Sequence, residues 1–244
     1  MTRINRQLPL YLSAPHTCSY LPDRLANTLF ADPDQPMDME TYSELLHYGF
    51  RRSGRMVYAP RCEGCHQCVS VRVPVDEFVP RRVHRRILQA NADIEVREHR
   101  AGFNPDHYEL YRRYTDARHG DGDMADATAA EYLGFLRADW SRTTFLEFFL
   151  EQELVAVAAT DLPVDGLSAV YTFFEPGLSA RSLGNLAILT QIERTRSMRL
   201  PYLYLGYWVR DCRKMAYKAN FRPIELWRGG QWQRVGPGEP LLQD

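Results

Sequence analysis

The sequence contains almost no lysine, although it carries 30 basic residues. Lys214 and Lys218 are its only lysines, so arginine supplies nearly all of the positive charge. It also lacks any apolar run of the roughly 20 residues that a membrane-spanning helix needs. No stretch near the amino terminus has the apolar length of a signal peptide. We therefore expect a cytoplasmic protein that makes no membrane contact.

The residues that are present exclude a disordered chain. Of 244 residues, 45% are hydrophobic, and they include 11 Phe, 14 Tyr and 4 Trp, enough for a sizeable core. The net charge of −1 conceals a pattern, because residues 51–100 and 181–234 are basic and residues 101–180 are acidic. Two basic blocks on one face would hold a polyanion. Helices that merely alternate in surface charge would give the same pattern.

The pattern along the chain predicts two parts. Residues 1–80 hold loops and short strands around the cysteines, which indicates a small Cys-rich module. Residues 81–244 predict the order β-α-α-β-β-β-α-β-α-β, an α+β domain with a mixed sheet flanked by helices. The predicted strands cover 56–59, 69–75, 93–99, 143–150, 154–161, 167–174, 202–206 and 224–232. The predicted helices cover 40–50, 105–118, a segment capped by Asp126 or Thr128 and ending at Trp140, 184–198 and 210–218. The same order occurs in the fold of the GCN5-related N-acetyltransferases.

Three of the five cysteines fall in one short window, Cys62-x-x-Cys65-x-x-Cys68. Cys18 is the candidate for a fourth ligand. Four thiolates suit tetrahedral zinc, and C-x2-C-x2-C is also a partial pattern of iron–sulfur proteins. The spacing indicates a metal or cluster without naming it, and free thiols in a turn are the alternative.

Two segments are candidates for binding an anion. Residues 79–88 contain four arginines and a histidine, which predicts either phosphate contacts or a solvated face. Residues 181–184, Arg-Ser-Leu-Gly, precede a predicted helix, whose free N–H groups suit an anion. Acetyltransferases hold coenzyme A there with a Q/R-x-x-G-x-G/A pattern, and Leu186 occupies its last small position. We therefore expect no nucleotide cofactor.

Aromatic and basic residues alternate over residues 202–218, YLYLGYWVRDCRKMAYK. Tyrosine rings stack on bases and basic side chains hold phosphates, as recognition of a single-stranded RNA end requires. A strand with core aromatics followed by a solvated helix is the alternative interpretation.

Several segments together resemble one family. They are CSYLPDR at 18–24, RSG-x-x-x-Y-x-P at 52–60, C-x2-C-x2-C-V-x-V-R-V-P at 62–74, RSLG at 181–184, and LGYWVRDCRKMAYKANFRPIE at 205–225. These motifs resemble the aminoacyl-tRNA–protein transferases over nearly the whole chain. The triple-cysteine loop is most similar to the bacterial branch, the aspartate/glutamate leucyltransferases. Eukaryotic relatives have a second cysteine where this sequence has Leu21.

The resemblance implies transfer of leucine from leucyl-tRNA to proteins that begin with Asp or Glu, which marks them for degradation by the N-degron route. On that basis we expect Arg181, Ser182 and Gly184 to face the tRNA 3′ end, and Tyr204, Tyr207, Lys214 and Lys218 to hold its terminal nucleotides. An arginine such as Arg72 or Arg82 would grip the acceptor carboxylate. His84 and Tyr171 are the candidates for proton transfer. Two other hypotheses remain: an acetyl-CoA-dependent N-acetyltransferase, and a non-enzymatic metal or redox sensor that binds RNA.

Overall fold

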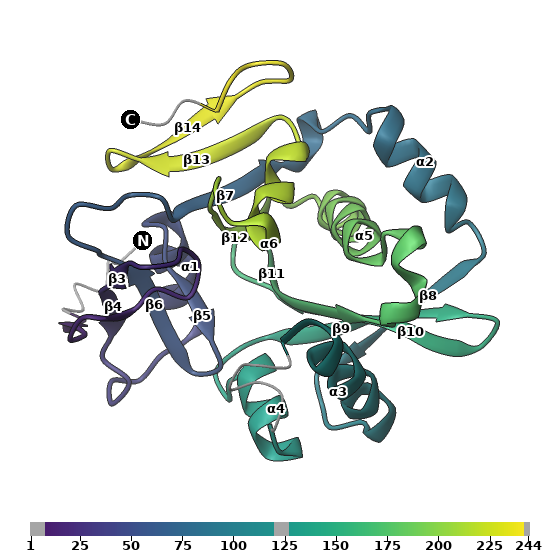
Figure 1. Cartoon of the computed structure of the whole chain (residues 1–244), viewed down its shortest axis with the longest axis horizontal. Coiled ribbons are helices and arrows are strands. Elements are labelled where there is room, and N and C mark those ends of the chain that lie inside the picture. Colours follow the sequence, from purple (N-terminus) through teal and green to yellow (C-terminus); the bar gives the residue numbers. More distant parts are fainter. Residues whose placement is uncertain (1–7, 120–126, 242–244) are drawn as a thin grey trace.

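The computed structural model describes residues 8–119 and 127–241 (Figure 1). Its main sheet has eight strands in the order β14-β13-β7-β12-β11-β10-β9-β8. The strands are β7 (Val69–Pro74), β8 (Ile94–Arg100), β9 (Thr143–Leu150), β10 (Glu153–Asp161), β11 (Gly166–Phe174), β12 (Tyr202–Trp208), β13 (Ile224–Arg228) and β14 (Gln231–Val235). β11 and β12 run parallel, whereas the other neighbouring pairs are antiparallel, so the sheet is mixed.

Helices cover both faces of the main sheet, as Figure 1 shows. α2 (Arg82–Ala90) and α5 (Leu183–Ser197) lie on one face, and α3 (Pro105–His119) and α4 (Ala129–Leu136) on the other. Because side chains alternate along a strand, Ala156 and Ala158 of β10 pack with α5. Val157 and Ala159 of the same strand pack with the tyrosines of α3 and α4. The predicted mixed sheet flanked by helices is therefore confirmed.

A second, four-stranded sheet lies beside the main one. It contains β1 (Leu10–Leu12), β4 (Thr28–Ala31), β6 (Met56–Pro60) and β5 (Arg51–Ser53), and packs with α1 (Met39–His47). β2 (His16–Thr17) pairs with β3 (Leu25–Ala26). Tyr204 of β12 belongs to the core of this small sheet, so the two sheets share packing. β7, inside the predicted module of residues 1–80, is hydrogen-bonded between β12 and β13. The boundary at residue 80 stays a prediction.

Several element predictions need correction. Residues 82–90 form α2, a helix hidden in the sequence because His84 is its one buried residue. The predicted strand 224–232 is a hairpin, since Gly229 and Gly230 turn the chain with φ of +56° and +77°. The predicted helix 210–218 is a short helix, α6 (Arg213–Ala216), followed by a 3-10 turn, Tyr217–Asn220. Further 3-10 turns cover Val75–Glu77 and Pro176–Arg181.

The cap prediction for α4 is confirmed at one of its two candidates. The hydroxyl of Thr128 accepts a hydrogen bond from the Glu131 N–H, and the Glu131 carboxylate accepts one from the Thr128 N–H. The other candidate, Asp126, lies outside the described residues. The helix ends at Leu136, before the predicted Trp140. Within residues 8–119 and 127–241, no helix has both the length and the apolar character to cross a bilayer.

Candidate functional site

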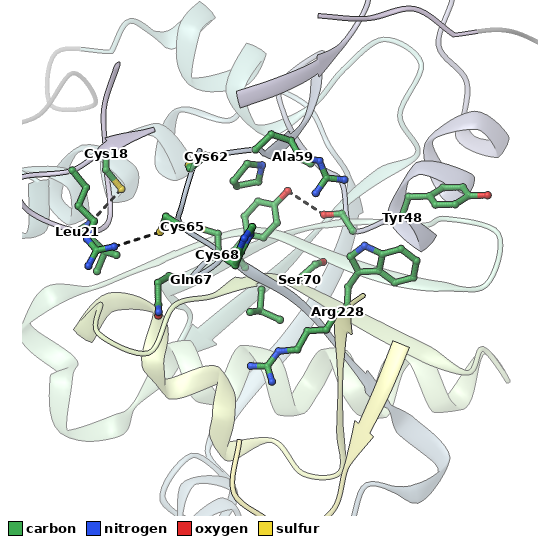
Figure 2. A pocket seen from close by; sticks show the side chains of 18 of the residues that line it. Cys18, Leu21, Tyr48, Ala59, Cys62, Cys65, Gln67, Cys68, Ser70 and Arg228 are labelled. Carbon is green, nitrogen blue, oxygen red and sulfur yellow. Dashed lines mark hydrogen bonds between the residues drawn. The ribbon is translucent and has the colours of Figure 1, made fainter. Parts of the chain in front are cut away.

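A pocket of about 870 Å³ lies where the small sheet meets β7 and β13. Its volume is in the range of small-molecule and cofactor sites. The residues that line it come from the loop before β3, the end of α1, the cysteine loop, β7, β12 and the β13–β14 turn. Figure 2 shows Cys18 and Cys65 towards one end and Tyr48 towards the other. The fold therefore brings segments from across the chain to one cavity.

All four predicted metal ligands line this pocket, and their role as ligands stays a prediction. Among the described residues, no three His, Cys, Asp or Glu side chains are placed to hold one ion. Three of the four sulfurs make hydrogen bonds to protein groups. Leu21 N–H donates to Cys18 Sγ at 3.4 Å, Cys62 Sγ donates to Asn27 O at 3.7 Å, and Arg24 Nη1 donates to Cys65 Sγ at 3.7 Å. Burial and the neighbouring thiols raise the pKa of Cys68 to about 12. The described residues therefore give no support to a bound zinc ion or iron–sulfur cluster.

Tyr207 has its hydroxyl committed to the backbone beside the pocket. The phenol donates to the carbonyl oxygens of Gly49 at 3.1 Å and Tyr58 at 3.0 Å. The residue is 1% exposed, and burial raises the pKa of its hydroxyl. Tyr207 therefore holds β12 against the end of α1 and β6. Contact between its ring and a nucleotide stays a prediction.

Lys218 is the second buried group at this end of β12. Its ammonium nitrogen donates to Tyr207 O at 2.7 Å. Burial, aided by the nearby Arg51 charge, lowers the pKa of Lys218 well below its usual value. Lys214 is different, because its side chain is exposed and its Nζ lies 3.4 Å from Arg118 O. The structure thus brings Tyr207 and Lys218 together and leaves Lys214 on the surface.

Arg51 occupies the space where β11 and β12 separate. The two strands pair only from Gly166 to Ser168, and β12 then has a bulge before Gly206. Beyond that point Arg51 Nη2 donates to Val170 O at 3.5 Å. A Cβ on Gly206, whose φ is +71°, would stand 3.1 Å from Arg51 Nη1. Glycine is therefore needed here both for the backbone conformation and for room.

Arg72, predicted to grip an acceptor carboxylate, already has an acidic partner. Its Nε donates to Glu225 Oε2 at 2.7 Å, and its Nη1 donates to the Tyr204 hydroxyl at 3.2 Å. The guanidinium also lies 3.6 Å from the Tyr202 ring centroid and 4.2 Å from that of Trp232. Tyr204, predicted to hold a nucleotide, is 2% exposed and donates to Asp165 Oδ2 at 2.9 Å. Both residues are engaged within the protein.

His84 lies between two aromatic rings, away from the pocket. Its ring stacks on Phe221 at 5.3 Å with an interplanar angle of 5°. Its Nδ1 accepts from the Arg81 N–H at 3.2 Å, which caps α2. Burial, and then the Arg81 charge, lowers the pKa of His84. Its Nε2 is buried without a hydrogen-bond partner in the described part of the chain. Arg82, next along α2, is exposed.

Tyr171 lies on β11 among other aromatic rings. Its ring centroid is 5.0 Å from that of Phe135 and 6.3 Å from those of Tyr111 and Tyr114. Burial raises the pKa of its hydroxyl, whose oxygen has no hydrogen-bond partner among residues 8–119 and 127–241. Tyr171 and His84 are therefore in separate packing environments.

Arg181, Ser182 and Gly184 form the junction before α5. Arg181 makes a two-pronged ion pair with Asp93, at 2.8 and 3.0 Å, and donates to Ala90 O. Ser182 is the N-cap of α5 with φ of +55°, and Gly184 packs against the Phe174 ring. This junction lies between α2 and β8, whereas Tyr207 contacts the α1 end and β6. Figure 1 shows these element pairs on opposite sides of the molecule.

The sequence analysis missed several residues that line the pocket. Arg61 follows β6 and precedes Cys62, and Arg228 ends β13 before the Gly229-Gly230 turn. Tyr48 and Trp227 supply aromatic surface, with ring centroids 6.1 Å apart. Because Arg61 directly precedes the cysteine loop, the sequence could have predicted it as a residue of the same site. Nothing local to Arg228 predicts the cavity, because its neighbours there come from the other end of the chain.

Comparison with known proteins now decides the family. The model for the N terminus of arginine-tRNA-protein transferases matches residues 16–86, and the model for their C terminus matches residues 106–228. The chain belongs to the arginine-tRNA-protein transferase family. This transferase is 48% identical to the aspartate/glutamate leucyltransferase of Chromohalobacter salexigens, over 97% of this chain and 96% of that protein. It is 50% identical to the protein of the same name from Alcanivorax borkumensis, over 93% of each chain.

Solved structures are less similar to this transferase than these sequences are. L-PGS from Bacillus licheniformis aligns with a TM-score of 0.44 at 11% identity, over 70% of this chain and 51% of that one. A likeness of this size does not assign a fold. The acetyltransferase and sensor hypotheses gain no support from any of these proteins.

Proposed function

We propose that this transferase moves leucine from leucyl-tRNA to the α-amine of cytoplasmic proteins that begin with Asp or Glu, and so marks them for degradation. The observation that carries the proposal is the relatives' shared name, aspartate/glutamate leucyltransferase, at 48–50% identity over nearly the full length of both chains. The motifs in the sequence analysis imply the same reaction through their resemblance to this family.

The proposed reaction needs positioning more than a reactive protein group. The acceptor nitrogen attacks the leucyl carbonyl carbon, the C–N bond forms, and the ester C–O bond to the tRNA ribose breaks. The amine loses a proton and the tRNA 3′ hydroxyl gains one. With a reference pKa of about 7.7–8.0, roughly a tenth of the acceptor amine is neutral at pH 7. Orientation and stabilisation of the tetrahedral oxyanion supply the rate without a covalent enzyme intermediate.

We place the tRNA phosphates against α2. Arg82, Arg85 and Arg86 are exposed along this helix, and none pairs with a carboxylate among the described residues. Arg81 and Arg85 donate to the carbonyl oxygens of Asn220 and Pro80, which do not cancel their charge. Clustered uncompensated arginines are the usual partners of a phosphate backbone. Arg181, Ser182 and Gly184, beside α2, stay our candidates for contact with the tRNA, whereas Lys214 and the buried Tyr204, Tyr207 and Lys218 stay the candidates at its 3′ end.

His84 and Tyr171 remain the candidates for proton transfer. Each has a buried polar atom without a protein partner in the described part of the chain, His84 Nε2 and the Tyr171 hydroxyl. An unpartnered buried group of this kind is costly, so a functional reason for retaining it is expected.

We also propose that the main sheet follows the acyltransferase arrangement of the GCN5-related fold. Its support is the parallel pair β11 and β12, which separates after three paired residues. The residues before β7 would then form the appended Cys-rich module, since β1, β4, β6 and β5 make a sheet of their own.

A transfer assay tests the proposed function. Purified protein is incubated with radiolabelled leucyl-tRNA and peptides that begin with Asp, Glu or Ala, with arginyl-tRNA as the control donor. We expect leucine on the Asp and Glu peptides only. Transfer of arginine instead would replace the donor assignment, and transfer from neither donor would overturn the proposal.

A further inference from the structure

We propose that Arg51, at the small cavity where β11 and β12 separate, is a catalytic residue that stabilises the oxyanion formed on the leucyl carbonyl oxygen. This inference rests on the proposed function and adds to it a residue that acts on the reacting ester. Arg51 was not among the site residues predicted from the sequence.

The ladder between β11 and β12 ends early. In the described part of the chain, β11 pairs with β12 only from Gly166 to Ser168, although it continues against β10 as far as Phe174. Backbone that leaves a ladder inside a sheet needs other partners for its N–H and C=O groups. Side-chain cations supply two contacts here, because Arg51 donates to Val170 O and Lys218 donates to Tyr207 O. The strands therefore open at a polar, positively charged place.

A cavity of about 10 Å³ lies at this point, lined by residues of both strands and by Arg51. That volume comes close to what one water-sized group occupies, so it suits a single carbonyl oxygen. The position is also one where ligands are expected. In sheets with parallel strands, they bind at the carboxyl ends of the strands, where neighbours diverge, and β11 and β12 are the parallel pair.

Arg51 brings a permanent positive charge to this cavity, and no carboxylate of the described residues compensates for it. It takes part in none of the ion pairs formed by residues 8–119 and 127–241. Within those residues its side chain has one hydrogen-bond acceptor, Val170 O, at the long distance of 3.5 Å. A guanidinium has five N–H donors, so Arg51 keeps the capacity to bind a further, negatively charged acceptor.

Aromatic rings hold Arg51 in a half-buried position. The guanidinium carbon lies 6.0 Å from the ring centroid of Tyr58 and 5.8 Å from that of Tyr207. Gly206 leaves room for it, since a Cβ at that position would stand 3.1 Å from Arg51 Nη1. Partial burial reduces the screening of a charge by water, so the attraction to a nearby anion becomes stronger. The arrangement therefore suits a charge that develops during a reaction.

The transfer reaction creates such a charge. When the acceptor nitrogen attacks the leucyl carbonyl carbon, the electron pair of the C=O π bond moves to oxygen, and the tetrahedral intermediate carries an oxyanion. Its collapse re-forms the C=O bond and breaks the C–O bond to the ribose, whose oxygen takes up a proton while the amine loses one. A guanidinium that donates to the oxyanion lowers the barrier of both steps and keeps its own protons throughout.

Other arginines are less suited to this role. Arg52 and Arg72 are each paired with a buried carboxylate, so their charges are already neutralised. The arginines of α2 are exposed, where water screens their charge. Arg51 combines partial burial with an uncompensated charge. It also lies against Tyr207, a candidate residue at the tRNA 3′ end in the proposed function.

The experiment measures the rate of leucine transfer to an Asp-starting peptide in a single turnover, with enzyme in excess over leucyl-tRNA. Leucyl-tRNA binding by filter assay and the midpoint of urea unfolding are measured alongside. The variants are Arg51→Gln and Arg51→Lys. The matched control is Arg55→Gln, because Arg55 is exposed on the turn of the same β5–β6 hairpin, where it donates to Pro33 O.

We expect Arg51→Gln to lower the single-turnover rate about 100- to 1,000-fold, the usual effect of removing a donor to an oxyanion. Leucyl-tRNA binding should stay close to that of the wild type, because the contact forms only in the transition state. Arg51→Lys should retain part of the rate, since the charge remains but the planar guanidinium does not. Arg55→Gln should keep the wild-type rate, and all three variants should keep the wild-type unfolding midpoint.

Two results would overturn the role of Arg51. One is a wild-type rate in Arg51→Gln. The other is a slower rate that weaker leucyl-tRNA binding fully accounts for, because Arg51 would then hold the tRNA and not the transition state. Wild-type protein that transfers no leucine to any peptide counts instead against the proposed function, so the two failures are distinct.

If Arg51→Gln lowers the unfolding midpoint, a measurement on the wild-type protein decides the question. A tRNA charged with a leucine analogue that carries a photoreactive diazirine in its side chain is cross-linked to the protein without an acceptor. We expect labels at Arg51 or within residues 169–174 and 204–208, around the cavity. Labels confined to other segments would mean that the leucyl group lies elsewhere, and the inference would be wrong.

Discussion

Arg52 of β5 and Asp161 of β10 form a fully buried, two-pronged ion pair, with Nε–Oδ2 at 2.5 Å and Nη2–Oδ1 at 2.6 Å. Thr143 also donates to Asp161, and Arg52 donates to the carbonyl oxygens of Leu136 and Gly54. The pair joins the small sheet to the main sheet across 109 residues of sequence. It gives the Arg-Ser-Gly motif at 52–54 a structural role, because a buried guanidinium requires every donor to be satisfied.

Removing one charge of this pair should destabilise the whole fold. We expect Asp161→Asn to lower the free energy of unfolding by about 3–5 kcal/mol, because Arg52 would keep a buried, uncompensated charge. The midpoint of urea unfolding measures this. Arg137→Gln is the control, since Arg137 pairs with Asp139 on the surface and should change stability by less than about 1 kcal/mol. Equal effects of the two substitutions would contradict the role of the buried pair.

Gly49 should tolerate no side chain. Its φ is +81°, and a Cβ there would stand 2.6 Å from Trp227 Cδ1 on the pocket wall. We expect Gly49→Ala to lower the free energy of unfolding by about 2–4 kcal/mol, through both the strained backbone and the displaced ring. Gly64→Ala is the matched control, because Gly64 also has a positive φ, +66°, but has open space around it. The control should lose only about 1 kcal/mol, and a Gly49 variant no worse than the control would refute the steric argument.

The buried imidazole of His84 should make stability depend on pH. Its pKa in the folded protein is lowered by burial and by Arg81, so below about pH 6.5 the unfolded chain binds a proton that the folded chain does not. Stability should therefore fall as the pH drops from about 6.5 towards the folded pKa, and level off below it. Urea unfolding at pH 7.5 and 5.5 should show a smaller difference for His84→Gln than for wild type. His107, whose pKa is also lowered by burial, retains part of the effect. The exposed His16 gives a control, and His16→Gln should leave the difference unchanged.

Tyr171→Phe separates catalysis from stability. The Tyr171 hydroxyl has no hydrogen-bond partner within the described residues, so its removal should leave the free energy of unfolding unchanged or slightly higher. If Tyr171 transfers a proton, kcat for leucine transfer should fall on the order of 100-fold. Tyr207→Phe is the contrasting variant, because its hydroxyl donates to two backbone carbonyls. It should lose about 1–3 kcal/mol of stability. Wild-type kcat in Tyr171→Phe would remove Tyr171 from the reaction.

Salt dependence reports the contacts between α2 and tRNA. If Arg82 and Arg86 each neutralise a phosphate, the double variant with glutamine at both positions should reduce the slope of log K against log salt by about 2. Arg97→Gln on β8 should keep the wild-type slope. A slope that is unchanged in the double variant would place the RNA on another face. An unchanged midpoint of urea unfolding in both variants distinguishes this effect from general unfolding.

Local sequence predicted most elements of the main sheet and its helices because their causes are local. The apolar runs of β9 and β10 and the cap of α4 lie within a few residues of the elements that they define. α2 escaped prediction because it turns an arginine-covered face to solvent and buries only His84. The β13–β14 hairpin escaped because two glycines interrupt a run that otherwise reads as one strand.

The amino-acid sequence by itself determined the family, most of the strands and helices after residue 80, and the cysteines and arginines available for chemistry. Only the tertiary structure decided which of these residues are paired inside the protein and which come together at one cavity. Arg72 is neutralised by Glu225, 153 residues away. Arg61, after β6 of the small sheet, and Arg228, at the end of β13 in the main sheet, line one cavity only because the two sheets meet there. Hydrophobic periodicity acts over a few residues, whereas charge pairing and cavities depend on contacts between distant segments, and no spacing in one sequence encodes those contacts.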